Sequence, residues 1–382
     1  MRAIEIAPNH SAGQRMHLAI STTSLRVGGA ERVAVNLSTG LVERGHDVDL
    51  VLVSAEGQLL GELHEDVNVV DLSARRVLTG VPSLHRYLRR AEPDLLYSMM
   101  PHNNVAAAMA LATNEDIPFV PSVHNMPSSE LGSTKDVLLF LAARSVYQNA
   151  DHCVAVSAGV RNDLVRTMGL SREDITVIYN PIVSDRLKRQ ASRDPEHPWF
   201  DEADVILGAG RHIEQKGFET LLRAFAIAQE NVSRELRLII SGQGPKTEEY
   251  CRLADSLGIV EDIDFPGFVD NIYAYLASAD LFVLPSRWEG FGNILVEAMA
   301  CGTQVVATDC QSGPAEILEE GAYGRLVPVD DVHGLADSMV AQLEDDRSFD
   351  VRKRASAFGI DTVAEAYEDL FADLVERKPR NG

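Results

Sequence analysis

The sequence lacks any long hydrophobic run, although 45% of its 382 residues are hydrophobic. A membrane-spanning helix needs roughly 18 to 20 consecutive apolar residues, so no span is predicted. Residues 1–14 also lack the basic stretch followed by an apolar stretch that defines a secretory signal. We expect residues 1–15 to be an irregular leader, disordered or even a misassigned start, with the fold beginning near Met16.

Cysteine and positive charge are both scarce. The four cysteines form no Cys-x-x-Cys pair and no dense pattern, which favours buried thiols in a reducing cytoplasm over disulfides or zinc. Against 57 acidic side chains stand 35 basic ones, and the net charge is −22. This balance argues against nucleic-acid binding. An anionic ligand would have to be bound by local basic residues.

Several motifs of hydrolases and metal enzymes are absent. Neither a Gly-x-Ser-x-Gly elbow nor a P-loop lysine motif occurs, and no cluster of His and Glu suggests a metal. Asp-x-Asp occurs at 47–49 and at 262–264, but each copy lies in or beside a strand pattern, so we interpret both as structural. No metal site and no cofactor are predicted.

Short β-branched or aliphatic runs alternate with longer helical patterns along the chain, which is typical of βαβ units with parallel sheets. The expected strands of the first half are 17–22, 47–53, 67–70, 94–98, 118–122, 152–157 and 175–178. Those of the second half are 204–209, 236–241, 263–265, 280–284, 304–308 and 325–327. The fold class is therefore α/β, with doubly wound parallel sheets.

Residues 184–203 are polar and show neither a helical nor a strand period, so they are the natural linker. Two Rossmann-like domains follow, an N-terminal one over 16–182 and a C-terminal one over 183–359. An amphipathic pattern at 363–375 closes the chain and could belong to either domain.

Glycine-rich loops follow three of the expected strands, where such sheets bind ligands and where backbone N–H groups can face phosphate. They lie at 27–32, with Gly28 and Gly29, at 208–211, and at 241–245, with Gly242 and Gly244. The second loop lacks the third glycine of Gly-x-Gly-x-x-Gly, because position 213 is Ile, so a nicotinamide cofactor is not favoured. Three such loops suit a phosphate-bearing ligand better than three unrelated turns.

Charged residues accompany these loops. Arg211 and Lys216 follow the second loop and could place a guanidinium and an ammonium against one diphosphate. Glu289 and Glu297 bracket an expected helix start after the strand 280–284, so both could face a ligand resting on backbone amides. These backbone amides are those of Gly290, Phe291, Gly292 and Asn293.

A histidine also follows one of the expected strands. His124 comes after the strand 118–122, although a lone loop histidine is more often structural.

The same segments resemble the retaining family-4 glycosyltransferases of the GT-B fold, from Met16 to nearly the end of the chain. The motifs that carry the resemblance are GGAER, GAGRHIEQKGFETLLRAF, SGQGP, PGFVDNIYAYLASADLFVLPSRWEGFGNILVEAMACGTQVVAT and SGPAEIL. It implies two domains that face each other across a cleft, with the helix 360–382 packing back onto the first. The segment SGPAEIL resembles the corresponding segment of the subgroup that extends lipid-linked or cell-surface glycans.

The resemblance also implies a role for each matched residue. Glu289 and His124 would contact the transferred sugar and Glu297 the ribose, while Arg211 and Lys216 would hold the diphosphate. The backbone at Phe268 and Val269 would grip the base, and Gly28 and Gly29 would lie near the phosphates and the acceptor. The implied donor is a nucleotide-diphosphate sugar, with UDP as the expected nucleotide, that carries a hexose or an N-acetylhexosamine. The implied acceptor is a glycan or a lipid-linked acceptor.

Two other functions remain open on sequence alone. A sugar-nucleotide epimerase, or a regulator that binds a sugar nucleotide without chemistry, could share the architecture. Neither accounts for Glu289, Glu297, Arg211 and Lys216 together.

A basic segment suggests a membrane surface as a further partner. Residues 73–90 contain no acidic side chain in a chain of net charge −22. They carry five arginines, namely Arg75, Arg76, Arg86, Arg89 and Arg90. Such a patch would attract anionic lipid, although a solvated helix face is equally consistent with it. We therefore expect a cytoplasmic protein that can be peripheral at the inner face of the membrane.

Overall fold

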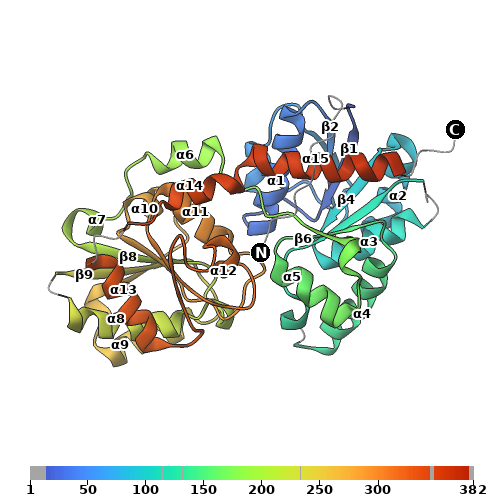
Figure 1. Cartoon of the computed structure of the whole chain (residues 1–382). Coiled ribbons are helices and arrows are strands. Elements are labelled where there is room, and N and C mark those ends of the chain that lie inside the picture. Colours follow the sequence, from blue (N-terminus) through green and yellow to red (C-terminus); the bar gives the residue numbers. More distant parts are fainter. Residues whose placement is uncertain (1–13, 113–115, 131, 233, 345–347, 378–382) are drawn as a thin grey trace. The chain divides into compact units, whose positions relative to one another are not determined.

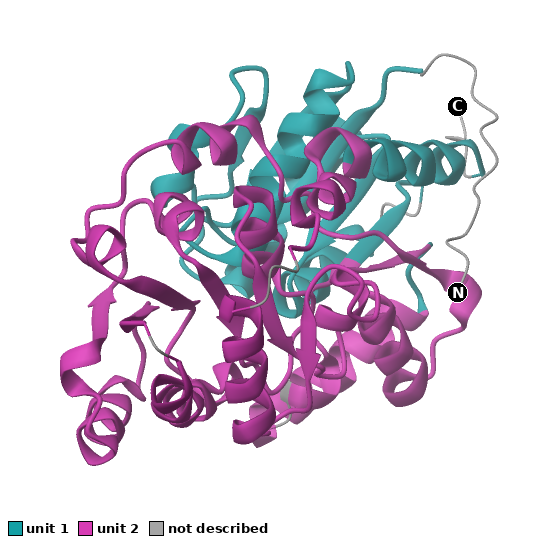
Figure 2. Cartoon of the chain, turned by 60° about the vertical axis from the view of Figure 1, so that its left-hand side comes forward, with its two compact units in different colours: residues 1–121, 149–151, 364–382 teal, residues 122–148, 152–363 magenta. Residues whose placement is uncertain are grey.

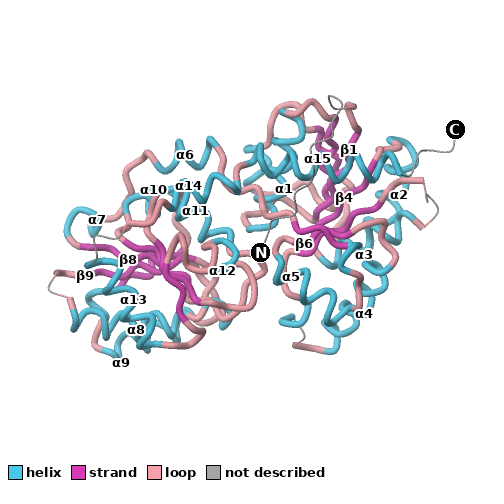
Figure 3. Tube along the Cα trace, in the orientation of Figure 1, coloured by secondary structure: helices cyan, strands magenta, loops and turns pink. Residues whose placement is uncertain are grey.

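The computed structural model describes residues 14–112, 116–130, 132–232, 234–344 and 348–377 (Figure 1). Most of the expected leader lies outside these residues. Parallel strands alternate with helices along the described chain, as Figure 3 shows. The expected α/β class with two parallel sheets is confirmed.

The N-terminal sheet has seven strands in the order β3-β2-β1-β4-β5-β6-β7. Its register begins with His17 opposite Asp47. Its strands are β1 (His17–Thr22), β2 (Asp47–Leu52), β3 (Asn68–Asp71), β4 (Leu95–Met99), β5 (Phe119–Val123), β6 (Cys153–Ala155) and β7 (Ile175–Val177). Each strand coincides with an expected one to within a few residues.

The second sheet has six strands in the order β10-β9-β8-β11-β12-β13. They are β8 (Asp204–Ala209), β9 (Leu236–Ser241), β10 (Ile263–Gly267), β11 (Leu281–Leu284), β12 (Val305–Thr308) and β13 (Arg325–Val327). Central strands of a parallel sheet are covered on both faces, which explains their nearly continuous apolar sequences. Ile206, Leu238 and Val283 accordingly lie in one buried core with Phe218 and Phe225.

Helices connect the strands and cover the sheets. In the first half they are α1 (Gly29–Glu43), α2 (Val81–Ala91), α3 (Pro101–Leu111), α4 (Thr134–Gln148) and α5 (Ala158–Asp163). In the second half they are α6 (Asp185–Ala191), α7 (Trp199–Glu202), α8 (Phe218–Asn231), α9 (Thr247–Leu257), α10 (Ile272–Ser278), α11 (Asn293–Cys301), α12 (Pro314–Ile317), α13 (Val332–Glu344), α14 (Val351–Ala355) and α15 (Ile360–Arg377).

The expected linker has more structure than its polar sequence indicates. Residues 184–203 contain α6 and α7, which are too short to show a helical period. His197 packs edge-on against Phe200 and Tyr275. Its Nε2 also lies 3.1 Å from the Asp264 carboxylate. Packing against α10 and the contact with Asp264 on β10 therefore order this segment, which sequence periodicity alone could not show.

Two compact units are distinguished in Figure 2 by colour. Unit 1 comprises residues 1–121, 149–151 and 364–382, and unit 2 comprises residues 122–148 and 152–363. Within unit 1, the hydroxyls of Tyr97 on β4 and Tyr367 on α15 lie 2.9 Å apart. Phe371 is fully buried beside both rings, and Glu368 pairs with Arg44 at the end of α1. These contacts hold the end of α15 against the first sheet.

Candidate active site

The residues singled out in the second half gather at the carboxyl edge of the six-stranded sheet. Its strand order reverses between β8 and β11, so the loops that follow these strands diverge there. A reversal of this kind is where open parallel sheets bind ligands. Lys216 comes from the loop after β8 and Glu289 from the loop after β11. All the contacts described below lie within unit 2 unless stated otherwise.

Lys216 and Glu289 form an ion pair at this point. The ammonium nitrogen of Lys216 donates to Oε1 of Glu289 at 2.5 Å, and the exposed fractions of the two side chains are 16% and 7%. The hydroxyl of Ser286 donates to the same oxygen at 2.7 Å. An ion pair this buried is sensitive to loss of one partner, because the other charge stays buried. Lys216 is therefore part of the packing of the site, and not a simple loop charge.

Arg211 differs from Lys216 in its surroundings. Its side chain is exposed, and among the residues that the structure describes it forms no ion pair or side-chain hydrogen bond. The next residue, His212, is fully buried, and its Nδ1 lies 2.8 Å from the Thr247 hydroxyl. Arg211 thus extends from a fixed backbone with its guanidinium available to an anion.

The glycines of the loop after β9 are required by close backbone packing. A Cβ on Gly242, whose φ is +126°, would lie 1.9 Å from the carbonyl oxygen of Gly210. A Cβ on Gly244 would lie 2.4 Å from that of His212. Packing between the two loops therefore explains part of the glycine pattern in the sequence without a ligand.

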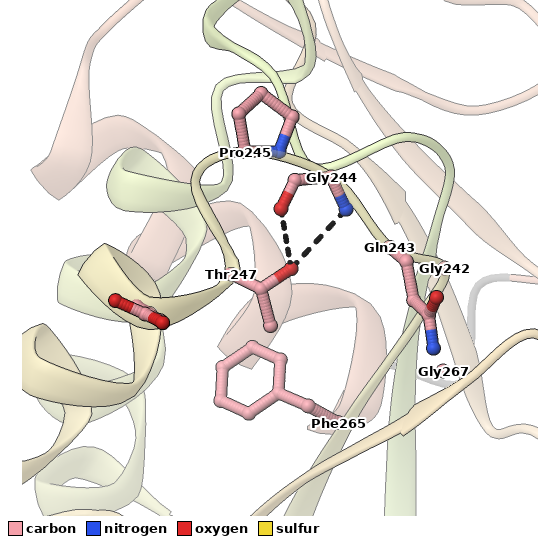
Figure 4. Close-up of a pocket in the computed structure, with 8 residues that line it drawn as sticks. Gly242, Gln243, Gly244, Pro245, Thr247, Phe265 and Gly267 are labelled. Atoms are coloured by element: carbon pink, nitrogen blue, oxygen red, sulfur yellow. Dashed lines mark hydrogen bonds between the residues drawn. The ribbon is translucent and has the colours of Figure 1, made fainter.

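An open pocket of about 690 Å³ lies beside this loop. Thr247 fixes the loop, since its hydroxyl donates to the carbonyl of Gly244 and accepts from the Gly244 amide, as the dashed lines in Figure 4 show. Phe265 forms a wall, and Gln243 extends toward Gly267. Next to Gly267, Phe268 is 69% exposed, which is unusual for an aromatic residue. Phe265 and Phe268 thus add apolar surface where the resemblance places the base.

The loop 290–293 is packed against the His124 segment. A Cβ on Gly290 would lie 1.8 Å from the carbonyl oxygen of His124, so only glycine fits. Gly292 has a φ of +101° and precedes Asn293, the first residue of α11. The two sequence segments, 166 residues apart by their numbers, therefore meet directly.

His124 is held as a neutral imidazole. Its Nε2 lies 2.9 Å from the hydroxyl of Ser122 on β5. Although part of the residue is accessible, burial of the ring lowers the pKa of His124 to about 4. An uncharged ring can donate or accept hydrogen bonds but cannot act as a cation at neutral pH.

The remaining predicted residues are placed more loosely. Glu297 lies half-buried within α11, with the Tyr273 hydroxyl 3.4 Å from its Oε1. Gly28 and Gly29 belong to unit 1, where Gly28 caps α1 in an extended conformation. The carboxylate of Glu31 occupies the space where a Cβ on Gly28 would lie. Their assignment to the phosphates or the acceptor stays a prediction.

The carboxylates of the two Asp-x-Asp segments are engaged with protein groups. In unit 1, Asp47 pairs with Arg15, and Asp49 accepts from Asn68 at 2.7 Å. In unit 2, Asp262 pairs with Arg237. No group of three or more His, Cys, Asp or Glu in the described ranges has the arrangement of a metal site.

Sequence reasoning missed a largely buried polar cluster next to Gly290. Ser157, Ser312 and Glu316 make it, and none of them was given a role. The last two lie in the segment SGPAEIL, which was used only to suggest a subgroup. Ser157 ends an expected strand, and nothing local marks it as more than a helix cap.

Two family models match the chain. One, described as Glycosyltransferase Family 4, covers residues 27–186, and the other, described as Glycosyl transferases group 1, covers residues 190–361. Together they span most of the sequence and include every site loop described above. The chain therefore belongs to the glycosyltransferases, as the motifs indicated, and it has their GT-B fold.

Individual relatives agree with this family. The chain is 29% identical to the lipopolysaccharide core biosynthesis glycosyltransferase LpsE of Rhizobium meliloti, over 92% of this chain and 97% of that one. It is 32% identical, over 53% of each chain, to a Campylobacter jejuni N-acetylgalactosamine-N,N'-diacetylbacillosaminyl-diphospho-undecaprenol 4-alpha-N-acetylgalactosaminyltransferase. Among solved structures, Anabaena HepE in complex with UDP and glucose superposes with a TM-score of 0.78 at 23% identity, covering 94% of this chain and all of that one.

The lowered pKa of His124 predicts a pH dependence of stability. The folded pKa of about 4 lies below the usual value near 6.5, so the unfolded chain binds the proton more readily. The stabilising contribution is complete above pH 6.5 and is lost as the pH falls toward 4. We expect wild type to lose more unfolding free energy than His124→Gln between pH 7 and about 4.5.

Tryptophan fluorescence in urea measures this difference, because Trp199 and Trp288 both lie in unit 2. His333→Gln, at an exposed site on α13, is the matched control and should follow wild type. Equal pH dependence of wild type and His124→Gln would show that His124 titrates normally.

Proposed function

We propose that this protein is a retaining glycosyltransferase that moves a hexose or an N-acetylhexosamine from a UDP-sugar to a glycan or lipid-linked acceptor. The observation that carries the proposal is the Lys216–Glu289 ion pair at the strand reversal. Arg211 lies on the same loop as Lys216, and within the described residues its guanidinium has no ion pair or side-chain hydrogen bond. The carboxylate of Glu289 suits sugar hydroxyls, and the cations of Lys216 and Arg211 suit a diphosphate. A glycosyl donor of the nucleotide-diphosphate kind presents both chemistries side by side.

Charge supplies the proposed mechanism. As the bond between the sugar and the diphosphate lengthens, negative charge grows on the diphosphate, and preorganised donors lower the energy of that state. Arg211 is free to approach the phosphates, and the ammonium of Lys216 has further N–H groups beyond the one that it gives to Glu289. With two cations in this role, the transfer is proposed to need no metal ion.

Glu289 fits the role of a sugar ligand better than that of a nucleophile. Lys216 and Ser286 both donate a hydrogen bond to its Oε1. Within the described part of the chain Oε2 has no hydrogen-bond partner, so it could accept from sugar hydroxyls. We assign no nucleophile among the described residues of the site, so retention would proceed by attack of the acceptor on the same face of the sugar. The neutral His124 would orient that sugar.

The comparisons support the choice of substrates. HepE of Anabaena was solved with UDP and glucose, which supports a uridine nucleotide. LpsE acts in lipopolysaccharide core biosynthesis, and the Campylobacter jejuni relative is named for a diphospho-undecaprenol acceptor. Among the described residues, no helix is long and apolar enough to cross a membrane. A lipid-linked acceptor would therefore be reached at a membrane surface.

A panel of nucleotide sugars tests the function directly. We expect slow hydrolysis of one UDP-sugar in the absence of acceptor, with release of the sugar as its α-anomer and no effect of EDTA. An epimerase would instead yield an isomeric nucleotide sugar, and a regulator would return the donor unchanged. Either of those results, or an absolute requirement for a divalent cation, would overturn the corresponding part of the proposal.

Replacing Arg211 should slow the chemical step. Loss of one preorganised donor to a developing anion typically costs about a hundred- to a thousand-fold in rate. We expect Arg211→Ala to lower kcat by about that factor at saturating donor without change in thermal stability, because the side chain is exposed and unpartnered among described residues. Arg223→Ala, at an exposed site on α8, is the control. A kcat within about three-fold of wild type would remove Arg211 from the diphosphate site.

Lys216 needs a different interpretation from the one that the sequence suggests. A residue on a strand-end loop is expected to be replaceable without loss of stability, yet Lys216 neutralises the buried carboxylate of Glu289. Its alanine variant should therefore lose both kcat and stability, and only the Arg211 variant separates the two effects.

The arginine patch offers a route to the membrane. All five arginines, Arg75, Arg76, Arg86, Arg89 and Arg90, are exposed, and none forms an ion pair within the residues described. Leu78, on the turn Val77–Gly80 between them, is 62% exposed. Basic residues at an anionic surface contribute about 1 kcal/mol each. We propose that the patch docks unit 1 on anionic lipid.

Liposome co-sedimentation measures this docking. We expect binding that rises with the anionic lipid content of the vesicles and falls at least ten-fold when all five arginines are replaced by glutamine. Replacing five exposed cations of unit 2, namely Lys188, Arg189, Arg193, Arg223 and Arg252, gives a control of equal charge change. Equal losses of vesicle binding in the two variants would show that net charge alone determines binding. Binding that does not depend on the anionic lipid content would exclude the arginine patch as the docking surface.

A further inference from the structure

We propose that the buried hydroxyls of Ser157 and Ser312, here called the serine pair, position the loop that carries Glu289 and that they control turnover. The inference rests on the proposed function and adds two positioning residues to it. Ser157 follows β6, and Ser312 precedes α12. Both hydroxyls donate to the carbonyl oxygen of Gly290, at 2.7 Å and 2.8 Å, and they lie 2.7 Å from each other.

The hydrogen-bond accounting favours a carbonyl that accepts twice. Two hydroxyls have two protons to share among three close contacts, and a carbonyl oxygen has two lone pairs. If both hydroxyl protons point to Gly290, both lone pairs of its carbonyl oxygen are used. Ser157 still accepts from the amide of Val160 at 3.1 Å, so it also caps α5. The residues are 0% and 2% exposed, so water does not compete for these bonds.

Fixing this carbonyl fixes the peptide plane of the loop. The C=O and N–H of a trans peptide point in opposite directions, so the amide of Phe291 must point away from the serine pair. Gly290 also packs directly against the carbonyl of His124. Rotation of this one peptide would disturb the backbone of Glu289 on one side and the His124 contact on the other. The serine pair therefore acts on the proposed sugar site through Gly290.

Glu316 holds the segment that carries Ser157. The Glu316 carboxylate accepts from the amides of Ala158 at 2.7 Å and Gly159 at 2.9 Å. A Cβ on Gly159 would lie 2.5 Å from that of Ser312, so the two segments interlock. Because Glu316 already occupies the first amides of α5, this short helix offers no ligand site. Its role is to keep Ser157 beside Gly290.

The test compares the single variants Ser157→Ala and Ser312→Ala, the double alanine variant and the conservative variant Ser157→Thr. A misplacement of about 1 Å in a reacting constellation can cost on the order of a hundred-fold in rate. We expect the double variant to lose about that much kcat for donor hydrolysis, while Kd for UDP, measured by calorimetry, stays within about three-fold. Ser157→Thr keeps a hydroxyl and should recover most of the turnover.

Thr303→Val is the matched control. Thr303 is also a buried hydroxyl that donates to a backbone carbonyl, that of Leu276, but it precedes β12 at the amino edge of the sheet. It should lower thermal stability without lowering kcat. If the double alanine variant retains kcat within two-fold, or if its loss of kcat is no larger than that of Thr303→Val at equal loss of stability, the serine pair is merely structural. A wild-type protein that turns over no UDP-sugar would instead refute the proposed function.

Discussion

The ion pair between Lys216 and Glu289 is the interaction on which the site depends. It joins the loops after β8 and β11, the two strands between which the sheet order reverses, and it is largely excluded from water. A buried pair contributes little net stability against apolar packing, because both charges lose their hydration. In the proposed function, the pair holds a cation and a carboxylate in fixed positions for the donor.

The rest of the site is arranged around this pair by backbone contacts. The loops after β8 and β9 pack so closely that Gly242 and Gly244 cannot carry a Cβ, and Gly290 lies directly on His124. Rigid, glycine-lined loops reduce the reorganisation that a developing charge would otherwise require. The serine pair extends the same principle, because it holds the Gly290 carbonyl of the Glu289 loop.

Much of the fold could be predicted from the sequence. All the strands were expected close to their observed bounds because parallel, doubly covered strands have short continuous apolar runs that end at glycine or polar residues. The short helices α6 and α7 were missed because they are stabilised by contacts such as that between His197 and Asp264, and not by their own periodicity. The two cations illustrate the same limit, since Arg211 and Lys216 look alike in sequence yet one is exposed and the other is paired and half-buried.

The sequence by itself determined the fold class, the family and the residues that carry charge at the strand ends, because these depend on local patterns and motifs. Only the tertiary structure decided which of these residues meet. Lys216 reaches Glu289 across 73 positions, and Ser157 reaches Gly290 across 133. The lowered pKa of His124 likewise depends on burial by protein around its ring. Such contacts depend on bringing together segments far apart in the sequence and on excluding water, and a local sequence pattern predicts neither.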